Sequence, residues 1–227
     1  MATSATTSLT RSAAQNEPVV VRLLRNWGTI VVIVLVGIGF AFASPYFATV
    51  SNFNNILFAM IVSALVSVGL TYVIVAGSFD LSIGLIVTSI SIVTAYLIPV
   101  TGPFLAVILA LGVACLIGLV NGVLVTYGRL SGIVVTLGMS FVLGGLNQYV
   151  TNGYQIAVDY REEGFRWIGQ GRIGPIAVPV IIMLVVFLIG WMIQSRTRAG
   201  HYMAAVGDNP MAAYYSGIPV YRWVIFS

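Results

Sequence analysis

The sequence predicts an all-α polytopic membrane protein, and two observations support this prediction. Of its 227 residues, 59% are hydrophobic and only 7% are charged, whereas about a quarter of the residues in a soluble domain are charged. The apolar residues also form uninterrupted runs close to the roughly 20 residues that a helix needs to cross a bilayer. A membrane β-barrel would instead alternate apolar and polar residues. We therefore expect about six transmembrane helices plus the start of a seventh.

The expected elements follow one another along the chain. Residues 1–20 are rich in Ser, Thr and Ala and are expected to form a disordered cytoplasmic tail. A transmembrane bundle is expected over residues 21–193. Its six apolar runs cover residues 27–47, 56–77, 81–98, 103–125, 132–150 and 175–193. We expect Pro99 to stop the third span, because proline removes a helical hydrogen bond.

Polar segments separate or follow these spans. We expect residues 151–174 to form an external loop and residues 194–222 a cytoplasmic segment, after which residues 223–227 start a truncated span. The formal charge of +4 comes from arginine alone, because the chain has no lysine. Seven arginines lie on one side of the predicted bundle: Arg11, Arg22, Arg25, Arg129, Arg196, Arg198 and Arg222. The positive-inside rule places that side in the cytoplasm, so this charge indicates orientation and not nucleic-acid binding.

The spans differ in their small residues. Spans two to five each carry Gly, Ala, Ser or Thr at three- and four-residue spacing, which lets helices pack closely in lipid. Span six is almost entirely composed of large aliphatic residues. We therefore expect spans two to five to form the packed core and span six to face lipid.

Asp80 is the only charged residue between Arg25 and Arg129. A carboxylate at bilayer depth costs a few kcal/mol or more unless it is compensated, and glycines on both sides indicate that two helices meet here. In the simplest interpretation, Asp80 caps a helix that begins near Leu81, with help from Ser82. The carboxylate could also lie beside a translocation path or bind a substrate directly. These alternatives stay open.

Two further polar residues lie on the helices of the expected core. Asn121 is on span four and Thr136 is on span five. Most polar groups in such places form hydrogen bonds between helices. The alternative is that both line a substrate path together with Asp80.

A short capped helix is predicted in the cytoplasmic segment. Asp208 or Asn209 suits its N-cap, Pro210 its first turn and Gly217 the position just beyond its end. A helix of two turns is unstable alone in water, so it must pack on something. The residues alone leave open whether that is its own bundle or another protein.

Several kinds of site are excluded by composition. Without lysine the chain cannot form a Walker A loop, and its one histidine, His201, cannot make a paired-histidine metal site. We expect no catalytic residues, no metal and no cofactor. The single cysteine, Cys115, is interpreted as a small residue of the apolar core.

Three sequence blocks carry a resemblance to a known family. They are Gly77–Gly84 (Gly-Ser-Phe-Asp-Leu-Ser-Ile-Gly), Asn121–Val125 followed by Ile133–Gly138, and Thr197–Gly200 continuing to Ile218. With the order of the spans they cover residue 27 to the end of the chain. The sequence resembles the permease subunits of ATP-binding-cassette monosaccharide importers of the ribose, xylose and galactose type, which belong to the branched-chain amino-acid permease superfamily.

The chain departs from this family at several points. Ser131-Gly132 replaces a Pro-Pro pair, Gly144 replaces an arginine, and His201 replaces another arginine. Family members also continue further, with more spans. The resemblance therefore implies a C-terminally truncated permease.

The resemblance implies a function and a set of partners. The chain would translocate a ribose- or xylose-like monosaccharide by alternating access across a bacterial inner membrane. Its partners would be a cytoplasmic ATP-binding subunit, a second permease subunit (itself or a paralogue), a periplasmic or lipid-anchored sugar-binding protein, and membrane lipid. The chain itself would not be an enzyme. The residues implied in ATPase coupling are Gly200, Gly207, Asp208, Asn209, Pro210, Ala212, Ala213 and Gly217.

Two other functions are considered. A secondary transporter or channel could use Asp80 as an ion or proton site, although the absence of a second intramembrane charge disfavours it. A truncated permease could also be non-functional. An enzyme is disfavoured, because His201, Asp208 and Ser216 share one segment whose spacing does not support a catalytic triad.

Overall fold

The computed structural model describes residues 19–156 and 163–227 and divides them into two compact units, with the boundary between Ile56 and Leu57. The tail predicted for residues 1–20 lies outside the described residues, except for Val19 and Val20, which begin a helix. Residues 157–162 of the predicted external loop also lie outside them.

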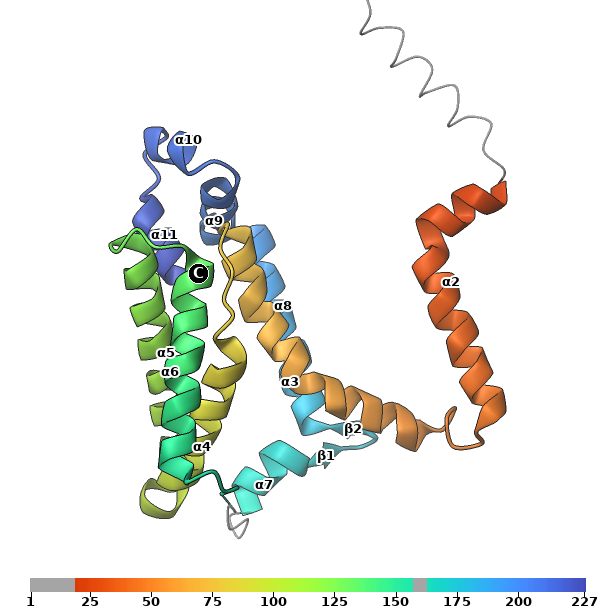
Figure 1. Ribbon diagram of the computed structural model, residues 1–227. Coiled ribbons are helices and arrows are strands. Elements are labelled where there is room, and N and C mark those ends of the chain that lie inside the picture. Colours follow the sequence, from red (N-terminus) through yellow and green to blue (C-terminus); the bar gives the residue numbers. More distant parts are fainter. Residues whose placement is uncertain (1–18, 157–162) are drawn as a thin grey trace, which may run out of the picture. The chain divides into compact units, whose positions relative to one another are not determined.

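The first unit contains α2 (Val19–Ala43) and the first turns of α3 (Val50–Val75) (Figure 1). The rings of Phe40 and Phe47 stack with their centroids 5.4 Å apart. The Thr49 hydroxyl accepts a hydrogen bond from the Asn52 N–H at 3.2 Å. Both contacts order the turn that leads from α2 into α3.

The second unit contains the rest of α3 and all later elements. These are α4 (Ile83–Thr101), α5 (Pro103–Thr126), α6 (Gly132–Thr151), α7 (Glu163–Gln170), β1 (Arg172–Ile173), β2 (Ile176–Ala177), α8 (Val178–Arg196), α9 (Arg198–Asp208), α10 (Pro210–Tyr215) and α11 (Val220–Phe226). In the described residues, α3, α4, α5, α6 and α8 are long and apolar enough to cross a membrane. The predicted class, an all-α polytopic membrane protein, is confirmed.

The helices α4, α5 and α6 pack together, and α9, α10 and α11 gather at one end of this group (Figure 1). The small side chains Ala106 and Ala110 of α5 are almost completely buried, as is Ser89 of α4. Small residues at these positions allow the helices to approach closely, as expected in lipid.

The expectation that span two joins this core is wrong. Its helix, α3, pairs with α8, where Ile61 contacts Ala177 and Val180 in an apolar cluster. The Tyr72 hydroxyl donates a hydrogen bond to the Gly190 carbonyl oxygen at 2.8 Å. One face of α8, the helix of span six, therefore packs against α3, although most of the large side chains of α8 remain exposed.

Two expected span boundaries also need correction. The third span does not stop at Pro99, because α4 continues to Thr101. Pro99 lies in the last turn, and the helix ends at Gly102, whose φ is +76° and whose N–H bonds to the Ile98 carbonyl oxygen. The sixth span does not begin at Pro175, because residues 172–177 form the β1–β2 hairpin and α8 starts at Val178.

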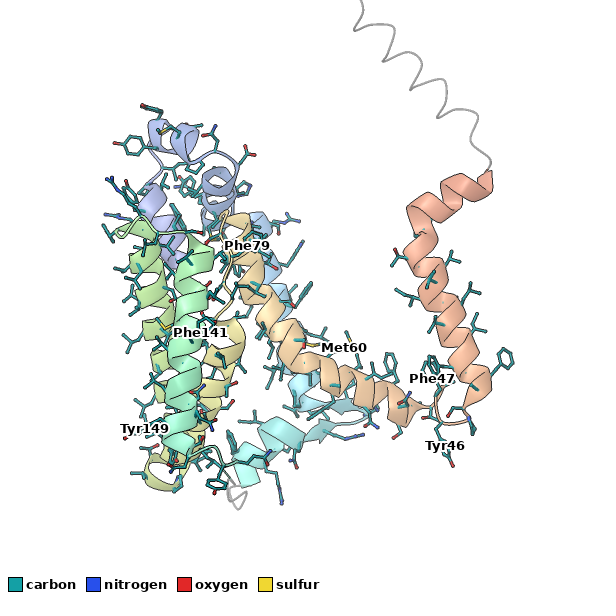
Figure 2. All side chains as sticks on the ribbon, in the orientation of Figure 1. Tyr46, Phe47, Met60, Phe79, Phe141 and Tyr149 are labelled. Atoms are coloured by element: carbon teal, nitrogen blue, oxygen red, sulfur yellow. The ribbon has the colours of Figure 1, made fainter. Side chains whose placement is uncertain are left out.

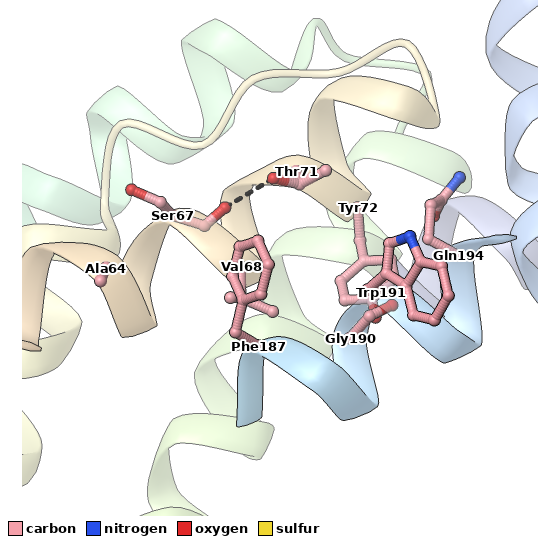
Figure 3. A pocket seen from close by; sticks show the side chains of 9 residues that line it. All are labelled: Ala64, Ser67, Val68, Thr71, Tyr72, Phe187, Gly190, Trp191 and Gln194. Atoms are coloured by element: carbon pink, nitrogen blue, oxygen red, sulfur yellow. Dashed lines mark hydrogen bonds between the residues drawn. The ribbon is translucent and has the colours of Figure 1, made fainter. Parts of the chain in front are cut away.

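A cavity of about 420 Å³ lies beside the contact between α3 and α8 (Figure 3). Its lining includes Val68, Tyr72, Gly190 and Trp191, but none of the site residues predicted from the sequence. A Cβ added to Gly190 would lie 2.6 Å from Val68 Cγ1. Gly190 therefore sets how closely these two helices approach.

We predict that Gly190→Ala lowers the free energy of unfolding by about 1–3 kcal/mol, because the added methyl overpacks the α3–α8 contact. A denaturant titration in detergent micelles, followed by far-UV circular dichroism, measures this change. Gly112→Ala is the matched control, since a Cβ there meets nothing within 4 Å in the described residues. Equal stability of the two variants would contradict the predicted packing.

Candidate functional site

A short non-helical segment, residues 76–82, joins α3 to α4 between two spans. The end of α3 is closed by two hydrogen bonds, from Gly77 N to the Ile74 carbonyl oxygen and from Ser78 N to the Val73 carbonyl oxygen, both at 3.0 Å. Gly77 has a φ of +83°, a conformation that favours glycine. The sequence thus ends a helix between two candidate membrane spans, where free backbone groups need partners within the protein.

Asp80 supplies one such partner. Its Oδ1 accepts hydrogen bonds from the Ser82 N–H at 2.7 Å and from the Ser82 hydroxyl at 2.6 Å. The capping-type hydrogen bond expected of Asp80 is therefore present. The helix begins later than expected, however: α4 starts at Ile83 and Ser82 is its N-cap residue. Asp80 holds the turn before the cap and is not the cap itself.

Asn121 and Thr136 reach the same segment from α5 and α6. Asn121 Nδ2 donates to the hydroxyl oxygen of Ser82, which is fully buried, at 3.0 Å. Thr136 Oγ1 accepts the Leu81 N–H at 3.0 Å and donates to the Gly132 carbonyl oxygen at 2.8 Å. Three residues that the sequence analysis singled out are thus brought together at one turn, with Ser82 as the link between Asp80 and Asn121.

Sequence reasoning did not single out Ser82 or Ser140 as site residues. Ser140 Oγ lies 3.0 Å from the Leu81 carbonyl oxygen and 2.9 Å from the Thr136 carbonyl oxygen. The signal that could have found it is its position one turn after Thr136 on the same face of α6. The Ser140 hydroxyl then reaches the carbonyl oxygen of Leu81, the residue whose N–H is bound by Thr136.

A cavity of about 690 Å³ borders this polar cluster. Asp80, Asn121 and Thr136 line it together with small residues of α5 and with Arg222 of α11. Asn121 is 5% exposed, and its Oδ1 has no hydrogen-bond partner among the described residues. A buried acceptor without a partner costs about 1–3 kcal/mol, so a hydroxyl or water donor would be favoured here.

No metal site accompanies this cluster in residues 19–156 and 163–227. They contain no group of three or more His, Cys, Asp or Glu side chains that could hold an ion. The cysteine interpreted as a core residue, Cys115, is exposed and borders the cavity. That interpretation is wrong, because the Cys115 side chain is exposed and not packed in the core.

The predicted short cytoplasmic helix is α10. Its N-cap is Asn209 and not Asp208, and Asn209 Oδ1 accepts the N–H groups of Met211 at 3.1 Å and Ala212 at 3.0 Å. At the other end, Gly217 has a φ of +80° and the Ile218 N–H bonds to the Ala213 carbonyl oxygen. Both ends are therefore closed by local hydrogen bonds.

One face of α10 is anchored and the other is free. Ala213 is 4% exposed, whereas Met211, Tyr214 and Tyr215 are all more than half exposed. Beneath them, Met203 and Val206 of α9 are completely or almost completely buried. The short helix thus stands on α9 and presents large side chains outward.

Gly207 of α9 packs directly on the start of the segment that carries Asp80. A Cβ on Gly207 would overlap the Val75 carbonyl oxygen and lie 2.9 Å from Gly77 N. Conversely, a Cβ on Gly77 would lie 3.2 Å from the Gly207 Cα. Two glycines, far apart in the sequence, thus let the backbone of α9 rest against residues 75–77.

The other residues implied in coupling lie apart from this contact. A Cβ on Gly200 would overlap the backbone of Gln194, so Gly200 allows the tight turn from α8 into α9. Asp208, Asn209, Pro210 and Ala212 lie at the exposed end of the segment. Among the residues implied in coupling, Gly207 is the one whose backbone packs against residues 75–77 in the described part of the chain.

A comparison with protein families now bears on these features. The family described as "Branched-chain amino acid transport system / permease component" matches residues 52–227. The chain belongs to this permease family. The resemblance drawn from the sequence blocks is confirmed, and the five apolar helices of the described residues make this permease a multi-pass protein of the cell membrane.

Several relatives of the permease are named for sugar transport. The ribose import permease protein of Escherichia coli is 36% identical over 201 residues, which cover 87% of this chain and 62% of that protein. The ribose import permease protein of Bacillus subtilis is 33% identical over 196 residues, covering 86% and 60%. The D-allose transport system permease protein of E. coli is 31% identical over 222 residues, covering 95% and 67%. The chain thus spans about three fifths of the ribose relatives' length. No solved structure matches it significantly.

We predict that Ser82→Ala destabilises the permease by about 1–3 kcal/mol. The substitution removes the Ser82 hydroxyl and with it the hydrogen bonds to the Asn121 amide and the Asp80 carboxylate. Unfolding in detergent measures the change. Ser91→Ala is the control, since that hydroxyl bonds only to the Val87 carbonyl oxygen of its own helix among the described residues. A loss of stability no larger than that of the control would contradict a linking role for Ser82.

Proposed function

We propose that the chain is the membrane subunit of an ATP-driven importer that moves a ribose- or xylose-like monosaccharide across the bacterial inner membrane. A separate cytoplasmic subunit would hydrolyse the ATP, so this subunit is not an enzyme. A sugar-binding protein, periplasmic or lipid-anchored, would deliver the substrate, and a second permease subunit would complete the path. Family membership and the sugar names of the relatives support this proposal.

The observation that carries the proposal is the contact between Gly207 and Gly77. It joins the segment that exposes α10 to the segment that carries Asp80, with no flexible side chain between the two backbones. A displacement of α10 and α9 would therefore reach residues 75–82 as a movement of packed backbone. Since packed contacts switch between discrete arrangements, such a link suits alternating access.

In this mechanism α10 is the coupling helix. Residues 194–222 lie in the cytoplasm, and the exposed face of α10 docks on the ATP-binding subunit. Nucleotide binding favours one conformation of the pair and so shifts the equilibrium between inward- and outward-open states. Asn209 and Gly217 keep the helix folded, Ala213 anchors it, and Pro210 and Ala212 lie on its docking side.

The cavity beside Asp80 is proposed as part of the substrate path. Asn121 and Thr136 would line it, and the unpaired Oδ1 of Asn121 would accept a hydrogen bond from a hydroxyl of a passing sugar or from water. Asp80 holds both donors of Ser82. This favours an organising role over the ion-carrying role that a secondary transporter would need.

We predict that Ala212→Arg abolishes co-purification of the ATP-binding subunit, because the bulky cation would stand on the docking face of α10. Pull-down of the tagged permease from detergent extracts measures retention of that subunit. Ala204→Arg on α9 is the matched control, since both alanines are exposed. If the two variants retain the same amount of the ATP-binding subunit, α10 is not the docking helix.

We predict that Gly207→Ala lowers ATP-dependent sugar uptake roughly tenfold, within the range of about 1–3 kcal/mol that couples distant sites. The ATP-binding subunit should still co-purify, because α10 is untouched. Uptake into proteoliposomes that contain the assembled importer measures the effect. Gly138→Ala, where a Cβ meets nothing within 4 Å in the described residues, is the control. Normal uptake by Gly207→Ala would argue against transmission through this contact.

A further inference from the structure

We propose that the halves of α4 and α6 remote from α9 hold a binding subsite for a neutral polyhydroxylated ligand, of the size of a monosaccharide. This inference deepens the proposed function and rests on it for the class of substrate. The site is distinct from the Asp80 cluster and contains none of the site residues predicted from the sequence.

A cavity of about 610 Å³ lies between the two helices. This volume falls within the range of about 300–1,000 Å³ that is usual for small-molecule sites. Its polar lining comes from both helices and from the chain just after α6: Thr88, Ser91, Asn147, Gln148, Thr151 and Tyr154. Thr88, Ser91 and Gln148 are exposed, so a ligand can reach them.

The hydrogen bonds of these side chains leave a definite pattern of free groups. The hydroxyls of Thr88 and Ser91 donate to carbonyl oxygens one turn earlier in α4, at 3.1 and 2.8 Å. Their oxygens therefore remain available as acceptors. The Ser89 hydroxyl lies 2.8 Å from the Leu85 carbonyl oxygen and 3.0 Å from Asn147 Oδ1, and the buried Nδ2 of Asn147 has no partner among the described residues. The cavity thus offers hydroxyl acceptors on α4 and the side-chain amides of Asn147 and Gln148 on α6.

This pattern fits sugar hydroxyls, each of which both donates and accepts. The described residues that line the cavity carry no formal charge. An amino-acid zwitterion would leave its carboxylate and ammonium without charged partners, at a high cost in desolvation. The cavity beside Asp80, by contrast, includes both Asp80 and Arg222. The site therefore favours a polyol over the amino acids named in the family description.

The position of the cavity on α6 also supports a ligand site. Ser140, Gly144, Asn147 and Thr151 follow one another at three- and four-residue spacing and so share one face. Phe141 and Tyr149, on the other side of the helix, are 75% and 81% exposed and suit a lipid contact (Figure 2). A polar face open beside such an apolar one needs a partner other than hydrocarbon.

The same face of α6 continues to Thr136 in the Asp80 cluster. With a rise of about 1.5 Å per residue, Asn147 lies roughly 16 Å along the helix from Thr136. A sugar released from the subsite would therefore follow one helix face to the cluster. The subsite lies at the end of α6 opposite to the end near α9 and would be the first to receive the substrate.

Saturation-transfer difference NMR on the full 227-residue chain in lipid nanodiscs tests the subsite with D-ribose, D-allose and L-leucine as probes. We expect signals from the two sugars and none from leucine. Asn147→Leu and Thr88→Val should each weaken sugar binding roughly five- to tenfold, because each removes a hydrogen-bonding group. Thr94→Val is the matched control, since its hydroxyl also bonds one turn back in α4 but does not line this cavity.

Three outcomes would overturn the subsite: no sugar signal from the unmodified chain, equal signals from leucine and sugar, or unchanged sugar binding in both Asn147→Leu and Thr88→Val. Far-UV circular dichroism confirms that the variants fold. Failure of the proposed function would be distinguishable, since it would show as a lack of ATPase docking while sugar binding persisted.

Discussion

The structure depends on one constraint, the need to satisfy backbone groups where the chain leaves helical geometry between α3 and α4. Lipid offers no hydrogen bonds to such a segment. Asp80 binds the Ser82 N–H, Thr136 binds the Leu81 N–H and Ser140 approaches the Leu81 carbonyl oxygen. Thr136 and Ser140 come from α6, whereas Asp80 belongs to the turn itself. The turn therefore fixes the register of α4 against α6 and, through Asn121, against α5.

A second consequence of this constraint is that a movement of the neighbouring helices can be transmitted to the bundle through this turn. A helix end held by several hydrogen bonds moves as a unit. Gly207 lets the backbone of α9 rest on residues 75–77 without an intervening side chain. In the proposed importer, the ATP-binding subunit moves α10, α9 transmits the movement to the turn, and α4 and α6 carry it along the polar face where the substrate would pass.

Much of this arrangement follows from local sequence, and the rest does not. Span four, predicted over 103–125, is α5 (Pro103–Thr126), because Pro103 starts it and a polar turn ends it. The cluster of Asp80, Asn121 and Thr136 follows from the high cost of polar groups in lipid. The pairing of α3 with α8 could not be predicted, since apolar helices look alike to a hydropathy pattern. The prediction that Pro99 ends the third span was wrong because a proline in the last turn of a helix removes few hydrogen bonds. The contact between Gly77 and Gly207 joins distant segments and leaves no periodic signal.

The central claim, that α9 moves the turn at Asp80, is tested most directly by hydrogen–deuterium exchange of residues 76–82 in the assembled importer. The exchange of these amides, read by mass spectrometry with and without ATP, reports on their hydrogen bonds. The account predicts that ATP changes exchange in α10 and in residues 76–82 together. A change confined to α10, with residues 76–82 unaffected by nucleotide, would contradict it.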